Sequence, residues 1–244
     1  MIPDNLPPGG FARIDSHQHF TPEFSPSLLY PILKRNRFDG TVSVVPSPSV
    51  EATRWLLGQA AEHEFVRGVV GWVDLGNPGA GQVLDEYQRH AKFRGVRWWF
   101  DGTLPQSLEE VARRGLTLDV ASGFTGQIVD RFPDMRVVID DVAAGQGSVP
   151  LEFAAHPNLY AKISGLITQA PTRWKVADFQ PAVRATLAAF GVDRVMYGSD
   201  WPSYLPTGTW KEALAAFTQA IGAQTMETRE HLLGATARRF YGLE

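Results

Sequence analysis

The chain of 244 residues contains no cysteine. This absence excludes disulfide bonds, thiolate metal ligands and a cysteine nucleophile. Basic residues are not in excess either, because 23 lysines and arginines stand against 26 acidic residues, for a formal net charge of −3. A general nucleic-acid-binding protein carries a basic surface, so this balance argues against a nucleic-acid partner.

Long apolar runs are also missing. No segment approaches the roughly 18 continuous apolar residues of a membrane span, and the first ten residues lack the basic start and apolar core of a signal peptide. We therefore expect a cytoplasmic protein without a membrane partner. Hydrophobic residues still make up 44% of the chain, and at this length they are enough for a sizeable core.

Apolar, β-branched runs alternate with helical patterns along the chain. The candidate strands span residues 12–20, 39–45, 66–75, 93–99, 116–120, 135–142, 159–163 and 195–198. Helical spacing covers residues 50–63, 81–90, 107–114, 124–132, 149–155, 179–190, 210–221 and 227–241. Eight strands alternating with helices over about 250 residues is typical of a (β/α)₈ barrel. The alternative, an open doubly wound sheet, lacks support because no glycine-rich phosphate turn follows the first strand.

No composition shift, repeat or low-complexity tract divides the chain. We therefore predict a single TIM-barrel domain over residues 1–244, of the α/β class, with a C-terminal helix. In such a barrel the functional side chains lie at the C-terminal ends of the strands. That rule restricts the search for an active site to the few polar residues that end each predicted strand.

The first predicted strand ends in two histidines. Strand alternation puts Asp15, His17 and His19 on one face. Two imidazoles in that arrangement can converge on one metal ion, one oxyanion or one substrate carbonyl. Asp200 lies in the turn after the eighth predicted strand, and in a barrel the first and last strands are neighbours. We predict that His17, His19 and Asp200 share one site.

The fourth and sixth predicted strands add two charged candidates. Arg97 shares a face with Trp99, and its planar, permanently charged fork suits a carboxylate or a lactone carbonyl. Strand parity puts Asp141 on one face with Val137 and Ile139. A carboxylate is a good ligand for zinc or manganese, so His17, His19, Asp141 and Asp200 are a candidate ligand set.

Other residues are candidates for contacts with a substrate. Asp119 ends the fifth predicted strand and Lys162 the seventh, and either residue is also suited to a buried ion pair. Large aromatic side chains at the same ends of the strands are candidates for a pocket wall, namely Phe20, Trp99 and Trp201.

These residues lie in motifs that resemble the amidohydrolase superfamily, in its branch of lactonase-like proteins. The motifs that carry the resemblance include Ile14-Asp15-Ser16-His17-Gln18-His19-Phe20, Arg94-Gly95-Val96-Arg97, Lys162-Ile163-Ser164-Gly165 and Tyr197-Gly198-Ser199-Asp200-Trp201-Pro202. The resemblance covers nearly the whole chain. It implies a distorted (β/α)₈ barrel that hydrolyses lactones, with a histidine pair at His17 and His19 and with Asp200 taking a proton from the attacking water. It also implies one divalent metal in some members and none in others.

The chain departs from the family pattern at several places. The family usually has Asp-His at the end of the sixth strand, where this chain has Asp140-Asp141. The loss of that histidine leaves a metal-free site open as an alternative. The chain has Val45 where the family often has glutamine, and the stretches 100–107 and 119–130 are several residues short.

Three functions follow from these observations. The first is a hydrolase that opens a lactone or another cyclic ester or amide, with His17 and His19 holding a metal or stabilising the oxyanion. The second is an isomerase or decarboxylase on the same barrel, with Asp141 and Asp200 as an acid–base pair. The third is a barrel that has lost catalysis and acts as a binding protein. In the enzymatic cases the expected partner is a small lactone or carboxylated ring compound, and a homo-oligomer remains open.

Overall fold

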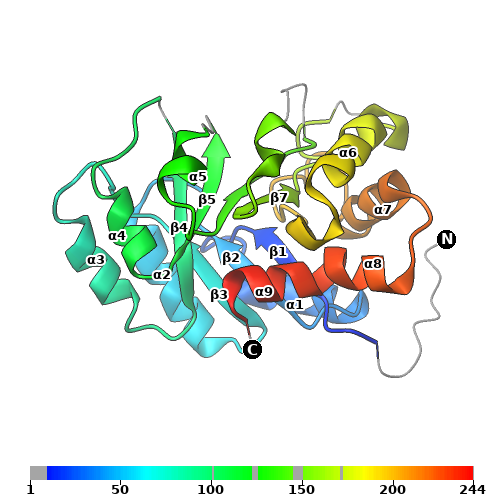
Figure 1. Cartoon of the computed structure of the whole chain (residues 1–244). Coiled ribbons are helices and arrows are strands. Elements are labelled where there is room, and N and C mark those ends of the chain that lie inside the picture. The colour runs from blue at the N-terminus through cyan, green and yellow to red at the C-terminus, as the bar shows by residue number, and fades with distance from the viewer. Residues whose placement is uncertain (1–9, 101, 123–125, 145–150, 171–172, 244) are drawn as a thin grey trace.

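Eight parallel strands with helices between them form the fold of the chain (Figure 1). The computed structural model describes residues 10–100, 102–122, 126–144, 151–170 and 173–243. The strands are hydrogen-bonded in sequence order from β1 to β8. They are β1 (Ile14–Gln18), β2 (Gly40–Val44), β3 (Val66–Gly71), β4 (Phe93–Trp99), β5 (Thr117–Ser122), β6 (Val137–Ile139), β7 (Leu159–Ile163) and β8 (Val195–Tyr197). The predicted (β/α)₈ barrel is confirmed.

Helices occupy the connections between the strands. The α-helices are α1 (Pro26–Arg35), α2 (Val50–Glu62), α3 (Ala80–Tyr87), α4 (Leu108–Arg113), α5 (Gln127–Arg131), α6 (Val176–Phe190), α7 (Trp210–Ile221), α8 (Met226–Glu230) and α9 (Thr236–Tyr241). The predicted helical segment 149–155 is a 3₁₀ helix where it is described, at Leu151–Ala155. Positions 124, 125, 149 and 150 of the predicted helices lie outside the described residues. None of the helices in the described ranges is both long and apolar enough to cross a membrane.

The helix α1 was not predicted, and its sequence explains why. Pro31 lies inside it, where proline normally interrupts the hydrogen-bond ladder. The buried side chains Leu29 and Leu33 are one turn apart, but Leu28 and Tyr30 are 52% and 43% exposed and obscure the apolar spacing. The helix is therefore stabilised by packing of its two buried leucines, and the apolar spacing of its sequence does not predict it.

The barrel closes at the seam between β1 and β8 by a mixture of contacts. Among the described residues, a single bridge between Gln18 and Trp201 links the two sides as strand pairing. Four further hydrogen bonds cross the seam. The Ser16 hydroxyl donates to the Tyr197 carbonyl (2.7 Å), and the Ser199 N–H donates to Asp15 Oδ1 (2.8 Å). Two bonds join backbone groups, from the Asp200 N–H to the His17 carbonyl (2.8 Å) and from the His19 N–H to the Trp201 carbonyl (2.7 Å). The candidate site residues of the first and last strands are therefore tied directly together.

The C-terminal helices pack against the start of the barrel. The helices α8 and α9, at the red end of the colour range in Figure 1, are joined by a π-helical turn at His231–Ala235. A Cβ atom on Gly234 would lie 2.0 Å from the carbonyl oxygen of Ala12, so only glycine allows this approach. The helix predicted over residues 210–221 is confirmed as α7, and it buries Trp210, Leu214, Phe217 and Ile221.

Candidate active site

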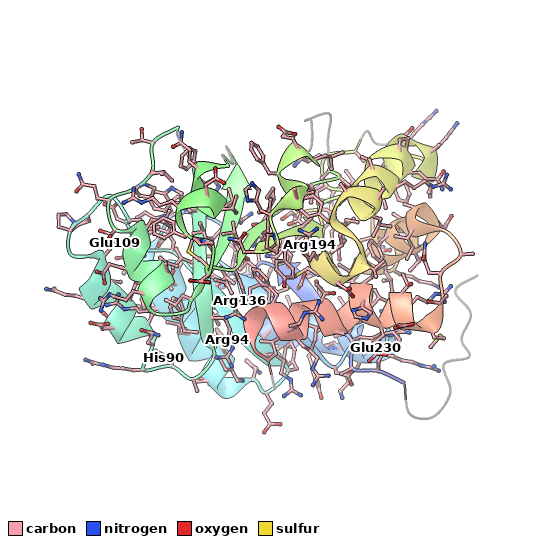
Figure 2. All side chains as sticks on the ribbon, viewed as in Figure 1. His90, Arg94, Glu109, Arg136, Arg194 and Glu230 are labelled. Carbon is pink, nitrogen blue, oxygen red and sulfur yellow. The ribbon has the colours of Figure 1, made fainter. Side chains whose placement is uncertain are left out.

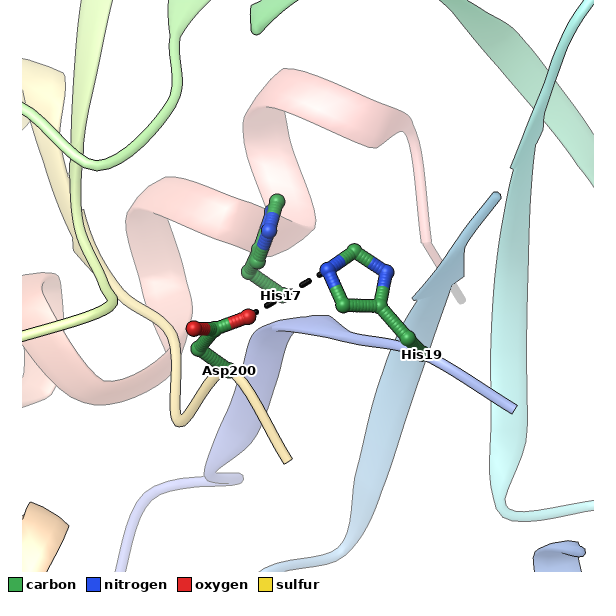
Figure 3. A group of neighbouring side chains, drawn as sticks. All are labelled: His17, His19 and Asp200. Atoms are coloured by element: carbon green, nitrogen blue, oxygen red, sulfur yellow. Dashed lines mark ion pairs between the residues drawn. The ribbon is translucent and has the colours of Figure 1, made fainter. Parts of the chain in front are cut away.

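Three polar side chains meet at the C-terminal end of the barrel, where β1 and β8 adjoin (Figure 3). His17 lies on β1, His19 follows that strand, and Asp200 lies in the turn after β8. Each residue offers one ligand atom, and these atoms all lie within 4.8 Å of one another. All three residues are buried, with exposed fractions of 0%, 7% and 5%. The structure thus brings together the three residues that the sequence singled out first.

The backbone around Asp200 fixes this arrangement. Gly198 comes two residues earlier, and a Cβ atom there would lie 2.4 Å from the Cβ of His17. Asp200 itself has a left-handed backbone with φ of 63°, a conformation that is uncommon outside glycine and concentrates at functional sites. Its N–H donates to the carbonyl of His17. The turn is therefore built so that the carboxylate lies beside the two imidazoles.

His19 presents its Nε2 nitrogen to Asp200. Its Nδ1 lies 2.7 Å from the carbonyl oxygen of Val44, which can only accept, so Nδ1 carries the proton. Its Nε2 lies 3.2 Å from Oδ1 of Asp200. Burial lowers the pKa of His19, and the carboxylate of Asp200 opposes that shift. In the neutral ring Nε2 and Oδ1 are two hydrogen-bond acceptors, so either a proton on Nε2 or a cation is needed to join them.

The donor atoms of this group are of the kind that divalent cations bind. Neighbouring ligand atoms of a tetrahedral zinc site lie about 3.3 Å apart when each is about 2.0–2.1 Å from the metal. The separation of 3.2 Å between His19 Nε2 and Asp200 Oδ1 matches that spacing. The Nε2 atom of His17 is buried without a hydrogen-bond partner. Two imidazoles and one carboxylate form a donor set that zinc accepts, and three protein ligands leave a position for water or substrate.

Asp200 is ionised over the whole physiological pH range. Burial alone would raise its pKa, but hydrogen bonds and charge from His19, together with His17 and Thr168, lower it to about 2. The hydroxyl of Thr168 donates to Oδ2 of Asp200 at 2.6 Å. Thr168 was missed from the sequence because it lies in a loop after β7 and no motif marks it.

A buried charge network lies behind the histidines. The Nζ atom of Lys162 lies 2.5 Å from Asp119 Oδ2, 2.9 Å from Asp140 Oδ1 and 3.2 Å from His17 Nδ1. Burial alone would lower the pKa of Lys162, but the two carboxylates raise it. Burial likewise opposes ionisation of Asp140, yet Lys162, His17 and Arg97 keep the pKa of Asp140 well below its usual value.

Arg97 belongs to the same network. Its Nε donates to Asp140 Oδ2 at 3.0 Å, and one Nη donates to the carbonyl of Val45 at 3.0 Å. Its guanidinium carbon lies 4.8 Å from the centre of the Trp99 ring, which is half-buried. The predicted pairing of Arg97 and Trp99 on one face is therefore present, but the positive charge of Arg97 is already matched by Asp140.

Asp141 does not join the group of His17, His19 and Asp200, contrary to the predicted four-residue ligand set. Strand β6 ends at Ile139, and Asp141 has a left-handed backbone with φ of 55°, so strand alternation stops before it. Its Oδ1 accepts from the Ser164 hydroxyl at 2.6 Å. The residue that faces His17 from this strand end is Asp140, whose Oδ1 lies 3.5 Å from His17 Nδ1.

The residues predicted to contact a substrate are more deeply buried than expected. Phe20 and Trp201 are each 2% exposed and stack edge to face on one another, as core residues do. Asp119 is fully buried and accepts from both Lys162 and the Tyr241 hydroxyl, so it takes part in the ion pair that was its alternative role. Trp99 is the predicted aromatic wall residue that keeps some exposure.

None of the other four histidines joins the candidate metal group. His90 is exposed in the loop before β4, at the outer edge of the molecule (Figure 2). His156 and His231 each face an exposed aspartate instead, namely Asp130 at 3.7 Å and Asp193 at 3.0 Å.

Comparison with known proteins gives the family of this chain. A family model described as amidohydrolase matches residues 14–243. An L-fucono-1,5-lactonase of Burkholderia ambifaria is 33% identical and covers 95% of this chain and 96% of its own length. Another L-fucono-1,5-lactonase, from Burkholderia multivorans, is 28% identical over 96% of this chain and 97% of its own length. The first alignment spans 278 positions, so that relative carries segments that this chain lacks.

Solved structures show the same architecture. An amidohydrolase from Burkholderia multivorans with bound zinc superposes with a TM-score of 0.83 at 26% identity, covering 96% of this chain and all of its own. A 5-carboxyvanillate decarboxylase from Novosphingobium aromaticivorans shares the fold alone, with a TM-score of 0.64 at 14% identity over 96% of this chain and 97% of its own. With the family match across nearly the whole chain, this protein is an enzyme of the hydrolase class that belongs to the amidohydrolase family.

Proposed function

We propose that this enzyme hydrolyses a neutral, hydroxylated lactone at a metal site formed by His17, His19 and Asp200. The observation that carries the proposal is the buried approach of His19 Nε2 to Asp200 Oδ1 at 3.2 Å, two acceptors that a cation would join. The two relatives named L-fucono-1,5-lactonase support the choice of substrate, because each covers nearly the full length of both chains.

The three side chains would hold one divalent ion, with zinc or manganese as the candidates. When bound there, such an ion would polarise the lactone carbonyl and lower the pKa of a water molecule. The same ion would bring the net charge of the three ligands from −1 to +1, and that positive charge would attract the carbonyl oxygen of the lactone.

Asp200 is the proposed general base. It is ionised because its pKa is about 2, and its side chain is only 7% exposed, so it can accept a proton inside a largely dry site. As the water oxygen bonds to the acyl carbon, Asp200 takes one proton from that water. The acyl carbon–ring oxygen bond then breaks, and the proton passes to the ring oxygen, which leaves as a hydroxyl. The product is the open-chain hydroxy acid.

The charge balance favours a neutral lactone over a carboxylated ring. Arg97 was the predicted carboxylate receptor, but its charge is matched by Asp140 at 3.0 Å. Lys162 is fully buried and matched by Asp119 at 2.5 Å. Neither cation of this network is therefore free to neutralise a substrate carboxylate. Arg97 retains a proposed role in orienting the acyl group, beside Trp99.

The test is hydrolysis of L-fucono-1,5-lactone and related sugar lactones by the zinc-loaded protein, followed by product mass. We expect a product heavier than the substrate by one water, formed faster than by spontaneous opening. The Asp200→Asn variant should lower kcat by about 10²–10⁴-fold, whereas Asp134→Asn, at an exposed position, should leave it unchanged. A product of unchanged mass would point to isomerisation, and loss of CO₂ from a carboxylated ring would point to decarboxylation.

A further inference from the structure

Two groups of opposite character compete for one nitrogen of His17. The Nζ atom of Lys162 lies 3.2 Å from His17 Nδ1, and Oδ1 of Asp140 lies 3.5 Å from the same atom. All three side chains are fully buried, and separations of 3.2 and 3.5 Å leave no room for a water molecule between the atoms.

The two contacts require different forms of the imidazole. An ammonium group only donates, so a hydrogen bond from Lys162 needs a lone pair on Nδ1 and puts the ring proton on Nε2. A carboxylate only accepts, so a hydrogen bond to Asp140 needs the proton on Nδ1 and leaves Nε2 with a lone pair. Only the second form can bind a metal through Nε2, the atom of His17 that is buried without a partner.

We propose that Asp140 is a positioning residue that makes His17 a metal ligand, and that Lys162 opposes it by competing for Nδ1. This inference rests on the proposed metal site and goes beyond it, because it assigns opposite effects on metal affinity to two neighbouring residues. Loss of the hydrogen bond from Lys162 to His17 costs little, since the ammonium group retains its ion pairs with Asp119 at 2.5 Å and with Asp140 at 2.9 Å. A hydrogen bond that a ligating histidine donates to a carboxylate orients the ring and strengthens metal binding.

Asp119 provides a matched control within the same network. Like Asp140, it is fully buried and paired with Lys162. Unlike Asp140, it forms no ion pair with His17 in the described part of the chain, and its other hydrogen bond comes from the Tyr241 hydroxyl at 2.7 Å. Replacing either aspartate by asparagine removes one buried negative charge beside Lys162, but only one of the two replacements removes the carboxylate that faces His17.

The experiment measures zinc affinity by competition with a chromophoric chelator, and the unfolding midpoint of the same samples. We expect Asp140→Asn to weaken zinc binding by about 10–100-fold and Asp119→Asn to change it by less than about threefold, although both variants lower the unfolding midpoint. Equal losses of zinc affinity in the two variants would overturn the role of Asp140.

A double variant tests the part assigned to Lys162. Lys162→Met combined with Asp119→Asn removes one positive and one negative charge, so the network keeps its balance and Asp140 keeps Arg97. We expect this folded variant to bind zinc more tightly than the wild type, and weaker binding would overturn the competition. A wild-type chain that binds no zinc would contradict the metal site itself, whereas zinc binding with equal losses contradicts only the inference about Asp140.

Discussion

At the scale of single residues, the chemistry of the candidate site depends on the hydrogen bonds made by the second polar atom of each side chain. Nδ1 of His19 donates to the carbonyl of Val44, and Oδ2 of Asp200 accepts from the hydroxyl of Thr168. These contacts leave Nε2 of His19 and Oδ1 of Asp200 facing each other. The backbone carbonyl and the loop threonine therefore decide which atoms are available to bind a metal or accept a proton.

Asp141 offers a direct test of the ligand set at this scale. Its carboxylate is bound by Ser164 and lies outside the group of three metal-binding candidates. We expect Asp141→Asn to leave zinc affinity within about twofold of the wild type. Asp200→Asn removes a proposed ligand itself and should weaken zinc affinity by about 10–100-fold or more, the range found when an outer partner of a ligand is lost. Comparable losses in both variants, measured by chelator competition, would return Asp141 to the ligand set.

Asp15 gives the stability a pH dependence of known sign. Its side chain is fully buried, and burial raises its pKa from 3.8 to about 6, although hydrogen bonds from Ser199 and His17 oppose the shift. Between these two values the folded chain holds a proton that the unfolded chain has lost. The stabilisation is therefore complete below the lower value and is lost as the pH rises through the upper one.

The Asp15→Asn variant removes this dependence. Relative to the wild type, its free energy of unfolding should rise by about 2 kcal/mol between about pH 4.5 and about pH 7.5, from 1.36 kcal/mol per pKa unit. Urea unfolding of both proteins with a chelator present measures the difference at each pH. A difference that stays constant over this range would show that Asp15 is not a protonated group in the folded chain.

The sequence predicted the central residues of the site better than their surroundings. The spacing of His17 and His19 and the position of Asp200 were visible because strand ends are fixed by the apolar pattern. The choice between Asp140 and Asp141 was not visible, because it depends on the left-handed backbone of Asp141, which no parity rule contains. Thr168 was equally hidden, since a loop residue is placed only by the packing of the whole barrel.

At the scale of elements, the helices that follow β8 are closely fitted against the chain at the start of β1. The π-helical turn at His231–Ala235 brings Gly234 against the start of β1. A methyl group there would meet a backbone atom, which cannot rotate away as the end of a side chain can. The fit between the C-terminal helices and β1 is therefore sensitive to a single carbon atom.

Two glycine substitutions test that fit. Gly234→Ala should lower the free energy of unfolding by about 1–3 kcal/mol through overpacking against Ala12. Gly58→Ala is the matched control, because Gly58 lies inside α2 with open space around its Cβ position, and it should raise stability by about 0.5–1 kcal/mol. Denaturant unfolding distinguishes the two, and a neutral or stabilising Gly234→Ala would contradict the close approach.

The elements themselves were predicted where burial and local pattern agree. Seven of the eight strands lie within the predicted ranges, and β5 extends two residues beyond the predicted 116–120. Most of them are apolar runs, as parallel strands need when both faces are covered. The helix α1 was missed because its stability comes from two buried leucines and not from its periodicity, and it contains Pro31. The segment 149–155 shows the reverse case, since helical spacing there yields a 3₁₀ helix where the chain is described.

At the scale of the whole molecule, the barrel places its first and last strands side by side and puts the proposed ligands on both sides of their seam. A bound ion would therefore link residues about 180 positions apart in the chain, and the same ion would complete the catalytic group. The proposed preference for a neutral substrate is also argued at this scale, because Lys162 and Arg97 are paired inside the barrel with Asp119 and Asp140.

The most direct test of this account is a zinc titration of the metal-depleted protein while hydrolysis of L-fucono-1,5-lactone is measured. We predict that the rate rises in proportion to added zinc and stops rising at one equivalent per chain. The Asp200→Asn variant should stay about 10²–10⁴-fold slower throughout. Lactone hydrolysis that is independent of zinc, manganese and chelator would contradict the metal site, and no hydrolysis at any metal content would contradict the proposed function.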